Sequence, residues 1–364
     1  MLDELLMIPG PTNIAHSVIK EMSSKTVAHY GQEWTRFYNK VRKSLNDIIH
    51  TEDDIFLFVG SGHAALDSAI GSIIEKDDKV LVLSNGIFGE KLGKIAKLHK
   101  AKVTYINVEW GEVFDLNEIE DIIRENDFKA ILMVDVETST GVRNPIKQIC
   151  KIAKKYNILT FVDAVCSLGI EKFYKDDWLI DVCVSASQKG LGAPPGLAIV
   201  SINDFAWKLI KQRKTEIPGW YLNLEIMKEF ELNQGNYQPY GITMAIHNVF
   251  ALSKSLELIN DEGLNNRIYR HEKMAKYFRE NIKKMNLKIL CNNNYACNGV
   301  TAIECPSGYN SEDIVKKFKK DYNIRIASGL GRLANEYVRV GHMNQGASKN
   351  SLVPVISAFK DIIR

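Results

Sequence analysis

The sequence lacks three features that would each point to a particular class of protein. It contains no run of about 18 consecutive apolar residues, the length that a membrane-spanning helix needs. None of its six cysteines falls in a CxxC pair, so neither a zinc-site nor a thioredoxin-like spacing is present. Its 47 Lys and Arg residues nearly balance 44 Asp and Glu residues, which gives a net charge of +3. This small excess argues against a nucleic-acid-binding protein, which needs a strongly basic face.

The N-terminus also lacks the basic start of a secretory signal peptide, because Asp3 and Glu4 precede its short apolar run. Most of the cysteines lie within apolar stretches, where a free thiol behaves as a small hydrophobe. We therefore expect a cytoplasmic protein with reduced cysteines, no metal site, no membrane segment and no nucleic-acid partner.

What the sequence does contain is a regular alternation of apolar runs and amphipathic stretches. Its 364 residues suggest roughly two domains of about 150 residues each. The alternation covers residues 55–202. Strands are expected at 55–59, 79–83, 102–108, 130–135, 158–163, 181–185 and 197–201, and helices at 64–74, 88–98, 116–124 and 146–155.

This pattern predicts an α/β protein with a mostly parallel large sheet and helices on both faces. The last two apolar runs are joined by a short loop and could form an antiparallel element. Beyond residue 203 the alternation stops. Residues 204–240 look helical and then irregular, and 244–285 predict one or two long helices.

The C-terminal part of the chain predicts a smaller α+β domain. Its expected strands are 299–305, 324–327 and 337–340, and its expected helices are 311–320 and 349–363. We divide the chain into an N-terminal arm (1–20), a large domain (21–255) and a small C-terminal domain with its linking helix (256–364).

Polar residues follow several expected strands, and open parallel sheets bind ligands at the carboxyl ends of their strands. Gly60-Ser61-Gly62-His63 lies between a strand and a helix, whose N-terminal N–H groups favour a phosphate. A glycine turn before a helix is nevertheless more often only a turn. The segment Asp135-Val136-Glu137-Thr138-Ser139-Thr140-Gly141 is either the polar wall of a pocket or a capped loop.

Asp163 ends the expected strand 158–163, and Lys189 stands between the strand 181–185 and a Gly/Pro-rich loop. A buried acid costs free energy unless it is paired or hydrogen-bonded. Asp163 therefore either has a functional role, caps the N-terminus of a helix, or is exposed to solvent. A partly desolvated lysine loses its proton more readily and can form a Schiff base, although an ordinary surface lysine is the alternative. Together, a phosphate site, a strand-end acid and a lysine are what pyridoxal phosphate requires.

Short motifs spread over nearly the whole chain make a resemblance specific. The chain resembles the class V aminotransferases of the fold-type I pyridoxal-phosphate enzymes, close to the alanine–glyoxylate and serine–pyruvate aminotransferases. The motifs are Pro9-Gly10-Pro11-Thr12-Asn13, Gly60-Ser61-Gly62-His63, Asn85-Gly86-Ile87-Phe88-Gly89, Glu137-Thr138-Ser139-Thr140-Gly141-Val142, Val162-Asp163-Ala164-Val165-Cys166-Ser167, Ser187-Gln188-Lys189, Ala193-Pro194-Pro195-Gly196, Ser328-Gly329-Leu330-Gly331 and Val338-Arg339-Val340-Gly341-His342-Met343. The resemblance implies pyridoxal 5'-phosphate as cofactor and a homodimer with shared active sites.

The resemblance also implies a role for each matched residue. Lys189 would be the catalytic residue, forming the Schiff base and moving the proton between the substrate Cα and the cofactor. Asp163 would pair with the pyridinium nitrogen, and Phe88 would stack on the ring, where many relatives carry another aromatic residue. Thr138 would line the cofactor and the substrate. Arg339 would bind the substrate α-carboxylate as a planar, bidentate donor.

The remaining matched residues would hold the cofactor phosphate or leave room for the substrate. Those expected to hold the phosphate are Ser61, Gly62, His63 and Gln188. Tyr240 and Thr243 match the pair that reaches the phosphate of the neighbouring subunit. Gly10 would lie near the substrate carboxylate and allow a close approach of the backbone. Cys166 is expected to be a packing residue beside the cofactor.

The expected function is transfer of an amino group from a small L-amino acid, with alanine or serine favoured, to a 2-oxo acid such as glyoxylate or pyruvate. Similar enzymes use aspartate, 2-aminoethylphosphonate, ureidoglycine or pyridoxamine, and the segment 332–335 matches no known specificity. Pyridoxamine is disfavoured because its site needs no phosphate loop. A lyase on the same fold and a non-catalytic binding protein are further alternatives, although residues 320–345 lack the cysteine that a desulfurase needs.

Overall fold

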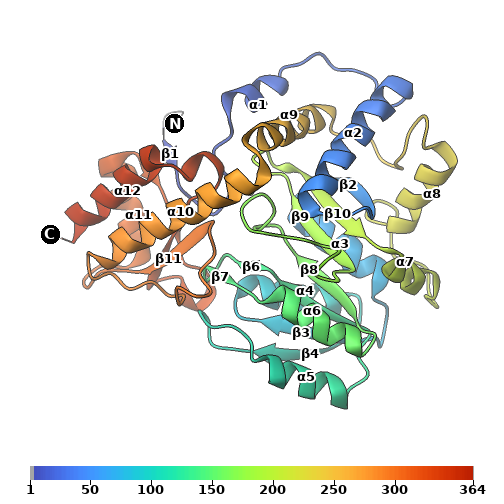
Figure 1. Ribbon diagram of the computed structural model, residues 1–364, viewed down its shortest axis with the longest axis horizontal. Coiled ribbons are helices and arrows are strands. Elements are labelled where there is room, and N and C mark those ends of the chain that lie inside the picture. The colour runs from blue at the N-terminus through green and yellow to red at the C-terminus, as the bar shows by residue number, and fades with distance from the viewer. Residues whose placement is uncertain (1–3, 364) are drawn as a thin grey trace.

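The computed structural model describes residues 4–363 and shows a large α/β part beside a smaller C-terminal part (Figure 1). The large part is built on a seven-stranded sheet with the order β2-β10-β9-β8-β5-β3-β4. Its strands are β2 (Asp54–Gly60), β3 (Lys79–Ser84), β4 (Lys102–Asn107), β5 (Ala130–Val134), β8 (Leu159–Asp163), β9 (Val182–Ala186) and β10 (Gly196–Ile202). Within this sheet β10 alone runs antiparallel to its neighbours. The mostly parallel sheet and its antiparallel element are therefore confirmed.

Four crossover helices cover the two faces of the sheet. They are α3 (Gly62–Ile73), α4 (Ile87–Leu98), α5 (Leu116–Glu125) and α6 (Ile146–Lys155). The chain crosses the sheet in one direction from β2 to β4 and returns from β4 to β8. Right-handed crossovers then place α3 and α4 on one face and α5 and α6 on the other, and the members of each pair contact each other. Strands β5, β8 and β9 are buried along their whole length because both faces are covered.

Further helices complete the large part beyond the sheet. They are α1 (His16–Glu21), α2 (Gln32–Ile49), α7 (Asp204–Lys211), α8 (Leu224–Gln234) and α9 (Ile246–Glu262). Helix α9 packs against α1 and α2, and one hydrophobic cluster extends from Trp34 to Ile259. A two-stranded hairpin, β6 (Val136–Glu137) with β7 (Val142–Arg143), follows β5. Neither α2 nor this hairpin was expected from the sequence pattern.

The smaller part has its own sheets and its own core. Its helices are α10 (Leu264–Lys283), α11 (Ser311–Tyr322) and α12 (Lys349–Ile362), and its strands are β11 (Val300–Glu304), β13 (Ala327–Ser328) and β14 (Tyr337–Gly341). The N-terminal strand β1 (Leu5–Leu6) pairs with β12 (Ile324–Arg325), and Met7 joins the hydrophobic cluster of this part. The smaller α+β part is thus confirmed, while the boundaries at 20/21 and 255/256 stay predictions.

One expected strand of the smaller part is wrong in its extent. Residues 324–327 form not one strand but the two short strands β12 and β13, which belong to different sheets. The reason is that Ile324 pairs with Leu5 from the other end of the chain, whereas Ala327 pairs with Arg339.

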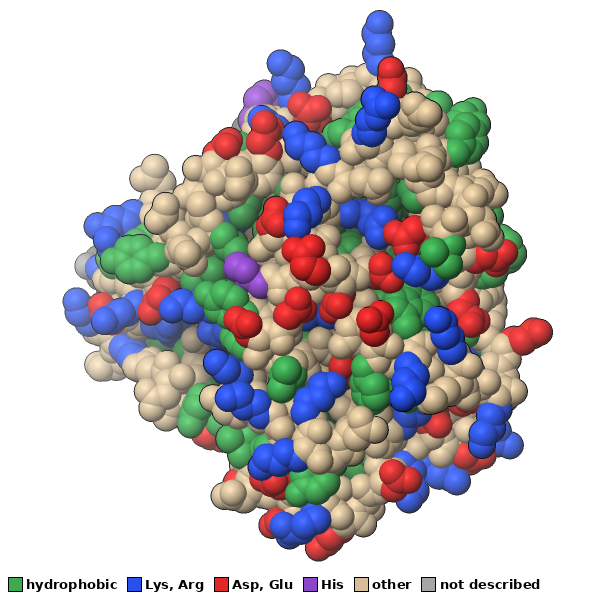
Figure 2. Space-filling view, turned by 45° about the vertical axis from the view of Figure 1, so that its right-hand side comes forward, with side chains coloured by type: hydrophobic (Ala, Val, Ile, Leu, Met, Phe, Trp, Pro, Cys, Tyr) green, Lys and Arg blue, Asp and Glu red, His purple; other side chains and the backbone are tan. Residues whose placement is uncertain are grey.

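Acidic and basic side chains are interspersed over the face of the molecule shown in Figure 2, with no large region of one sign. Among residues 4–363, no helix is both long enough and apolar enough to cross a membrane.

Candidate functional site

The segments that follow β5, β8 and β9 lie beside one another because these three strands are parallel neighbours. Val134 at the end of β5 pairs with Asp163 at the end of β8, and Asp163 in turn pairs with Val184 of β9. The segment 135–141 continues from β5, and Lys189 lies three residues beyond the end of β9. The sheet therefore brings the expected polar segment, acid and lysine to one edge.

Lys189 is half-buried, and residues near both ends of the chain form hydrogen bonds with it. Its amine donates a hydrogen bond to the carbonyl of Pro9. Its own carbonyl accepts hydrogen bonds from the Thr12 hydroxyl (3.3 Å) and from Asn344 Nδ2 (2.6 Å). Gly10 lies against this side chain with a φ of +111°, and a Cβ atom there would overlap the lysine side chain. Gly10 is therefore required by its backbone conformation and by the close approach of Lys189.

Asp163 is a buried acid that forms no ion pair with any basic side chain in the described chain. Its Oδ1 accepts a hydrogen bond from the backbone N–H of Val165 at 2.9 Å. Burial, the largest cause, raises the pKa of Asp163 from 3.8 to about 7; the negative charges of Glu137 and Asp135 act in the same direction. The Val165 N–H and the charge of Lys189 oppose this rise. An acid in this state favours a cationic partner.

The first turn of α3 provides a site for an anion next to Lys189. Ser61 is the N-cap residue, and its side chain accepts no capping hydrogen bond. A Cβ atom at Gly62 would lie 3.0 Å from a methyl group of Val165, so a larger side chain would crowd the site. Burial lowers the pKa of His63, and the charges of Lys91 and Lys189 lower it further. The buried amide oxygen of Gln188 has no hydrogen-bond partner in the described chain.

Glu137 orients the start of α4, a role that the sequence did not reveal. This fully buried carboxylate accepts hydrogen bonds from the backbone N–H groups of Phe88 (3.0 Å) and Gly89 (3.1 Å). It also accepts hydrogen bonds from the N–H and the hydroxyl of Ser139. An acid at a helix N-terminus satisfies unpaired N–H groups and interacts favourably with the helix dipole. The position of Phe88 therefore depends on Glu137.

Arg339 lies on β14 and extends from the smaller part toward the same edge. The residue is 8% exposed, and its guanidinium donates to the carbonyls of Ser328 (3.0 Å) and Thr138 (3.3 Å). Burial lowers its pKa to about 10, opposed by the charges of Glu137 and Cys166. It forms no ion pair with a carboxylate of the described residues. A buried guanidinium of this kind favours an anionic ligand such as a carboxylate.

Tyr240 lies inside the described chain, and its role toward the phosphate of a neighbouring subunit stays a prediction. This side chain is fully buried, and its hydroxyl donates to the carbonyl of His29 and accepts from the indole of Trp34. Its hydroxyl thus has two partners within the described chain. Thr243 is exposed, as is Tyr237, which lies against Tyr30 with ring centroids 5.3 Å apart. Tyr237 is thus the outward-facing tyrosine of this segment.

Asn344 is another residue that the sequence did not reveal. Its Nδ2 donates to the hydroxyl of Thr12 and to the carbonyl of Lys189, both at 2.6 Å. Its side-chain oxygen accepts from the buried guanidinium of Arg267. These contacts join the N-terminal segment, the lysine loop and the smaller part, and no sequence motif indicates them.

The residues at this edge fit pyridoxal phosphate. Lys189 would supply an amine for its aldehyde, and Asp163 would supply a buried acid for its ring nitrogen. The first turn of α3 would supply N–H groups for its phosphate, and Gln188 precedes Lys189 in the chain. The buried amide oxygen of Gln188 has no partner in the described chain, so it is suited to a hydrogen-bond donor, while the NH₂ group of the same amide is the part that can donate to an anion.

Comparison with known proteins agrees with this assignment. The aminotransferase class-V family profile matches residues 6–345. An uncharacterised aminotransferase of Methanocaldococcus jannaschii is 36% identical over 96% of this chain and 90% of its own length. The crystal structure of an alanine–glyoxylate aminotransferase from Nostoc sp. is 30% identical, with a TM-score of 0.96 over 100% of this chain and 96% of that one. A ureidoglycine–glyoxylate aminotransferase from Bacillus subtilis is 28% identical, with a TM-score of 0.93 over 100% and 93%.

The family match covers most of the chain, and the structural neighbours share its two-part architecture throughout their length. The family and the fold type expected from the sequence motifs are confirmed. The chain belongs to the class-V aminotransferases and is a pyridoxal-phosphate-dependent aminotransferase of fold type I.

Proposed function

We propose that this enzyme transfers the amino group of a small L-amino acid, alanine or serine, to glyoxylate or pyruvate. The observation that carries the proposal is Arg339, a buried guanidinium that contacts Thr138 and forms no ion pair with a described carboxylate. Both an amino acid and a 2-oxo acid present an α-carboxylate, so one arginine serves both substrates.

The proposed roles of the other residues follow from their positions. When bound, pyridoxal phosphate supplies an aldehyde that condenses with amines and a ring that withdraws electrons. Lys189 would remove the proton from the substrate Cα as a general base and then donate it, as an acid, to the carbon of the cofactor that carried the aldehyde. Asp163 would hold the proton of the ring nitrogen, and Phe88 would stack on the ring. Thr138, whose carbonyl accepts from Arg339, would line the cofactor and the substrate.

The phosphate would be held by residues at the start of α3 and before the catalytic lysine, namely Ser61, Gly62, His63 and Gln188. This loop supports a phosphorylated cofactor rather than free pyridoxamine as substrate. Gly10 leaves the space that the lysine side chain occupies. It would also allow the substrate carboxylate to approach the backbone.

A small, uncharged substrate side chain is supported by the pairing of Arg332. Aspartate or an aminophosphonate would need a second cation for its distal anion. Arg332, in the segment 331–333 above the start of α4, instead pairs with Glu109 at 3.1 Å and stacks on Trp110 at 4.6 Å. Glyoxylate as acceptor is supported by two relatives that are named for it but differ in their donors.

Exposed aromatic side chains support the proposed homodimer. Tyr30, Trp220, Tyr221 and Tyr237 are each at least 45% exposed, and three of them lie on the segment 219–241 that precedes α9. Large exposed aromatic residues are typical of protein interfaces. We also propose a cytoplasmic location, which the six unpaired cysteine thiols support.

The visible absorption of the purified enzyme tests the function directly. L-Alanine, added without any oxo acid, should convert the cofactor's absorption band to that of its amine form, and glyoxylate should restore it. L-Aspartate should convert it far more slowly. A band that persists with both alanine and serine would contradict the proposed donors. Conversion by aspartate at an equal rate would contradict the argument from Arg332.

Sedimentation analysis of Tyr237→Ser beside the wild type would test the dimer interface.

A further inference from the structure

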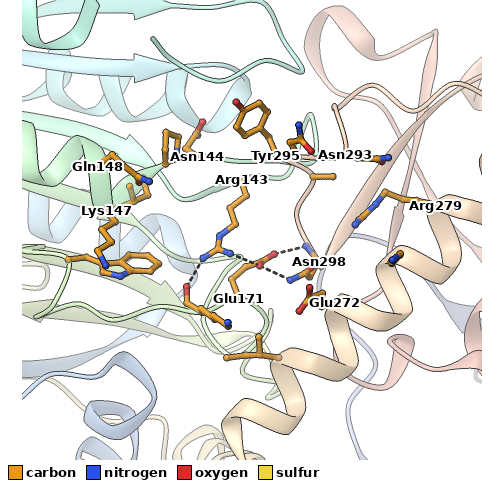
Figure 3. Close-up of a pocket in the computed structure, with 18 of the residues that line it drawn as sticks. Arg143, Asn144, Lys147, Gln148, Glu171, Glu272, Arg279, Asn293, Tyr295 and Asn298 are labelled. Atoms are coloured by element: carbon orange, nitrogen blue, oxygen red, sulfur yellow. Dashed lines mark hydrogen bonds and ion pairs between the residues drawn. The ribbon is translucent and has the colours of Figure 1, made fainter. Parts of the chain in front are cut away.

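A cleft of about 760 Å³ lies between the large and the smaller part, and none of the proposed catalytic or cofactor-binding residues lines it. One wall consists of residues 143–148 with Glu171, Lys172 and Trp178 (Figure 3). The other wall consists of α10 and the segment 293–298. At its base the two walls are joined by backbone hydrogen bonds, including Arg143 N–H to the Tyr295 carbonyl at 2.7 Å. The cleft is therefore a second cavity at the junction of the two parts.

Positive charge predominates in this cleft. Six of the lining side chains are Lys or Arg and three are Glu. The buried Glu171 is already satisfied: it pairs with Arg143 at 3.2 Å and accepts two hydrogen bonds from Asn298. Arg143 also lies 3.9 Å from the buried Asp135. Glu171 and Arg143 thus neutralise each other. The five remaining basic residues outnumber the two remaining acidic residues, Glu272 and Glu280 on α10, so the cleft keeps an excess of positive charge.

Arg279 on α10 is the most buried of these remaining cations. It is 9% exposed, and its Nη1 donates to the carbonyl of Cys297 at 2.8 Å. It forms no ion pair within the described chain, although a guanidinium carries five N–H donors. Lys276 and Lys283 lie three and four residues away, on the same face of the helix. Figure 3 shows Arg279 on the α10 side of the cleft, opposite the segment that carries Arg143 and Lys147.

The opposite wall adds the N-terminus of α6. Lys147 is the second residue of this helix, and its first turn contains no acidic side chain. The positive end of the helix dipole and the ammonium group of Lys147 therefore face α10 across the cleft. Positive groups on both walls repel each other unless an anion lies between them.

We propose that this cleft binds a small polyvalent oxyanion, such as a phosphate-bearing or carboxylate-rich metabolite, between Lys147 on α6 and Lys276, Arg279 and Lys283 on α10. An occupant would replace repulsion between the walls by attraction. It would thus hold the smaller part against the large part without entering the cofactor site. This proposal is independent of the amino donor and acceptor.

Calorimetric titration of the cofactor-loaded enzyme tests the proposal, because the cofactor's own phosphate then fills the active site. The probes are pyrophosphate and citrate, used at low ionic strength so that screening does not mask binding. We expect one site per chain, and the probe that binds more tightly identifies phosphate or carboxylate as the preferred group. The double variant Lys147→Gln/Lys276→Gln should bind the probe at least about tenfold more weakly than the wild type. Each substitution removes an exposed positive charge without disturbing the core.

Lys273→Gln is the matched control, because Lys273 lies on α10 but not in the cleft. It should change the affinity by less than about twofold. Three outcomes would overturn the proposal: no binding of either probe up to about 10 mM, equal weakening in the control and the double variant, or binding that occurs only when the cofactor has been removed. The last outcome would show that the anions enter the cofactor phosphate site.

Discussion

Replacing Asp163 by Asn tests the physical state of the acid at the centre of the site. The carboxyl group is buried, accepts one backbone hydrogen bond and has no cationic partner among the described residues. Its pKa is raised from 3.8 to about 7, mainly by burial. Because each factor of ten in proton affinity is about 1.4 kcal/mol, the ionised carboxylate destabilises the cofactor-free fold by roughly 4 kcal/mol.

The direction of the pH dependence follows from this rise. Below pH 3.8 the carboxyl is protonated in both the folded and the unfolded chain and costs nothing. As the pH rises toward 7, Asp163 ionises in the unfolded chain but keeps its proton in the folded chain, so the free energy of unfolding falls. Above about pH 7 the carboxyl is ionised in both states, and this loss of stability has reached its full size. Asn does not titrate and keeps the acceptor for Val165. Relative to the wild type, Asp163→Asn should therefore gain roughly 3 kcal/mol of stability between pH 5 and pH 8.

Urea unfolding of the cofactor-free proteins, followed by tryptophan fluorescence at several pH values, measures this difference. The control is Asp127→Asn, which makes the same substitution at an exposed position. Pyridoxal phosphate should stabilise the wild type more than Asp163→Asn, because the ring nitrogen supplies the missing cation. The reasoning about burial would be refuted if the wild type and Asp163→Asn differed by the same unfolding free energy at pH 5 and at pH 8. Equal stabilisation by the cofactor would refute the pairing with the ring.

Three other substitutions test the rest of the site. Lys189→Ala should abolish the visible cofactor band while circular dichroism stays unchanged; a retained band would show that another amine binds the aldehyde. Arg339→Gln should raise the KM for the amino donor by about 30-fold or more, which is the effect of losing roughly 2–5 kcal/mol from a buried charge pair. Arg332→Gln should change KM by less than about twofold, and equal effects would contradict the roles assigned to the two arginines. Gly10→Ala should reduce both activity and stability, whereas Gly308→Ala, whose φ is also positive (+85°) but whose Cβ meets nothing within 4 Å, should lose only about 1 kcal/mol of stability in urea unfolding. Similar losses of activity in both glycine variants would show that contact with Lys189 is not the cause.

The sequence predicted the large sheet well because its strands are determined locally. Runs such as Ala130–Val134 and Val182–Ala186 are apolar without interruption, as expected when helices cover both faces. Because the strands are parallel, their carboxyl ends lie at the same edge of the sheet. The positions of Asp163 and Lys189 at one edge therefore followed from the alternation alone.

The parts that the sequence did not predict depend on partners distant along the chain. Ile324–Arg325 separates from Ala327–Ser328 because Leu5 and Leu6 pair with the first two residues only. Tyr240 matched a motif, but its hydroxyl bonds to His29 and Trp34, more than 200 residues earlier. The motif identified the residue type but did not reveal these hydrogen-bond partners within the chain.

The placement of residues 5–12 has a consequence for synthesis of the enzyme. Leu5 pairs with Ile324, and Pro9 and Thr12 bond to Lys189, so this segment has partners in both parts of the chain. This segment is synthesised well before its strand partner, which at about 5–20 residues per second follows roughly 15–65 s later. The lysine loop therefore reaches its final geometry only when translation is almost complete. Chains that stop before Ile324 should be unable to transfer amino groups, however well their large sheet has folded.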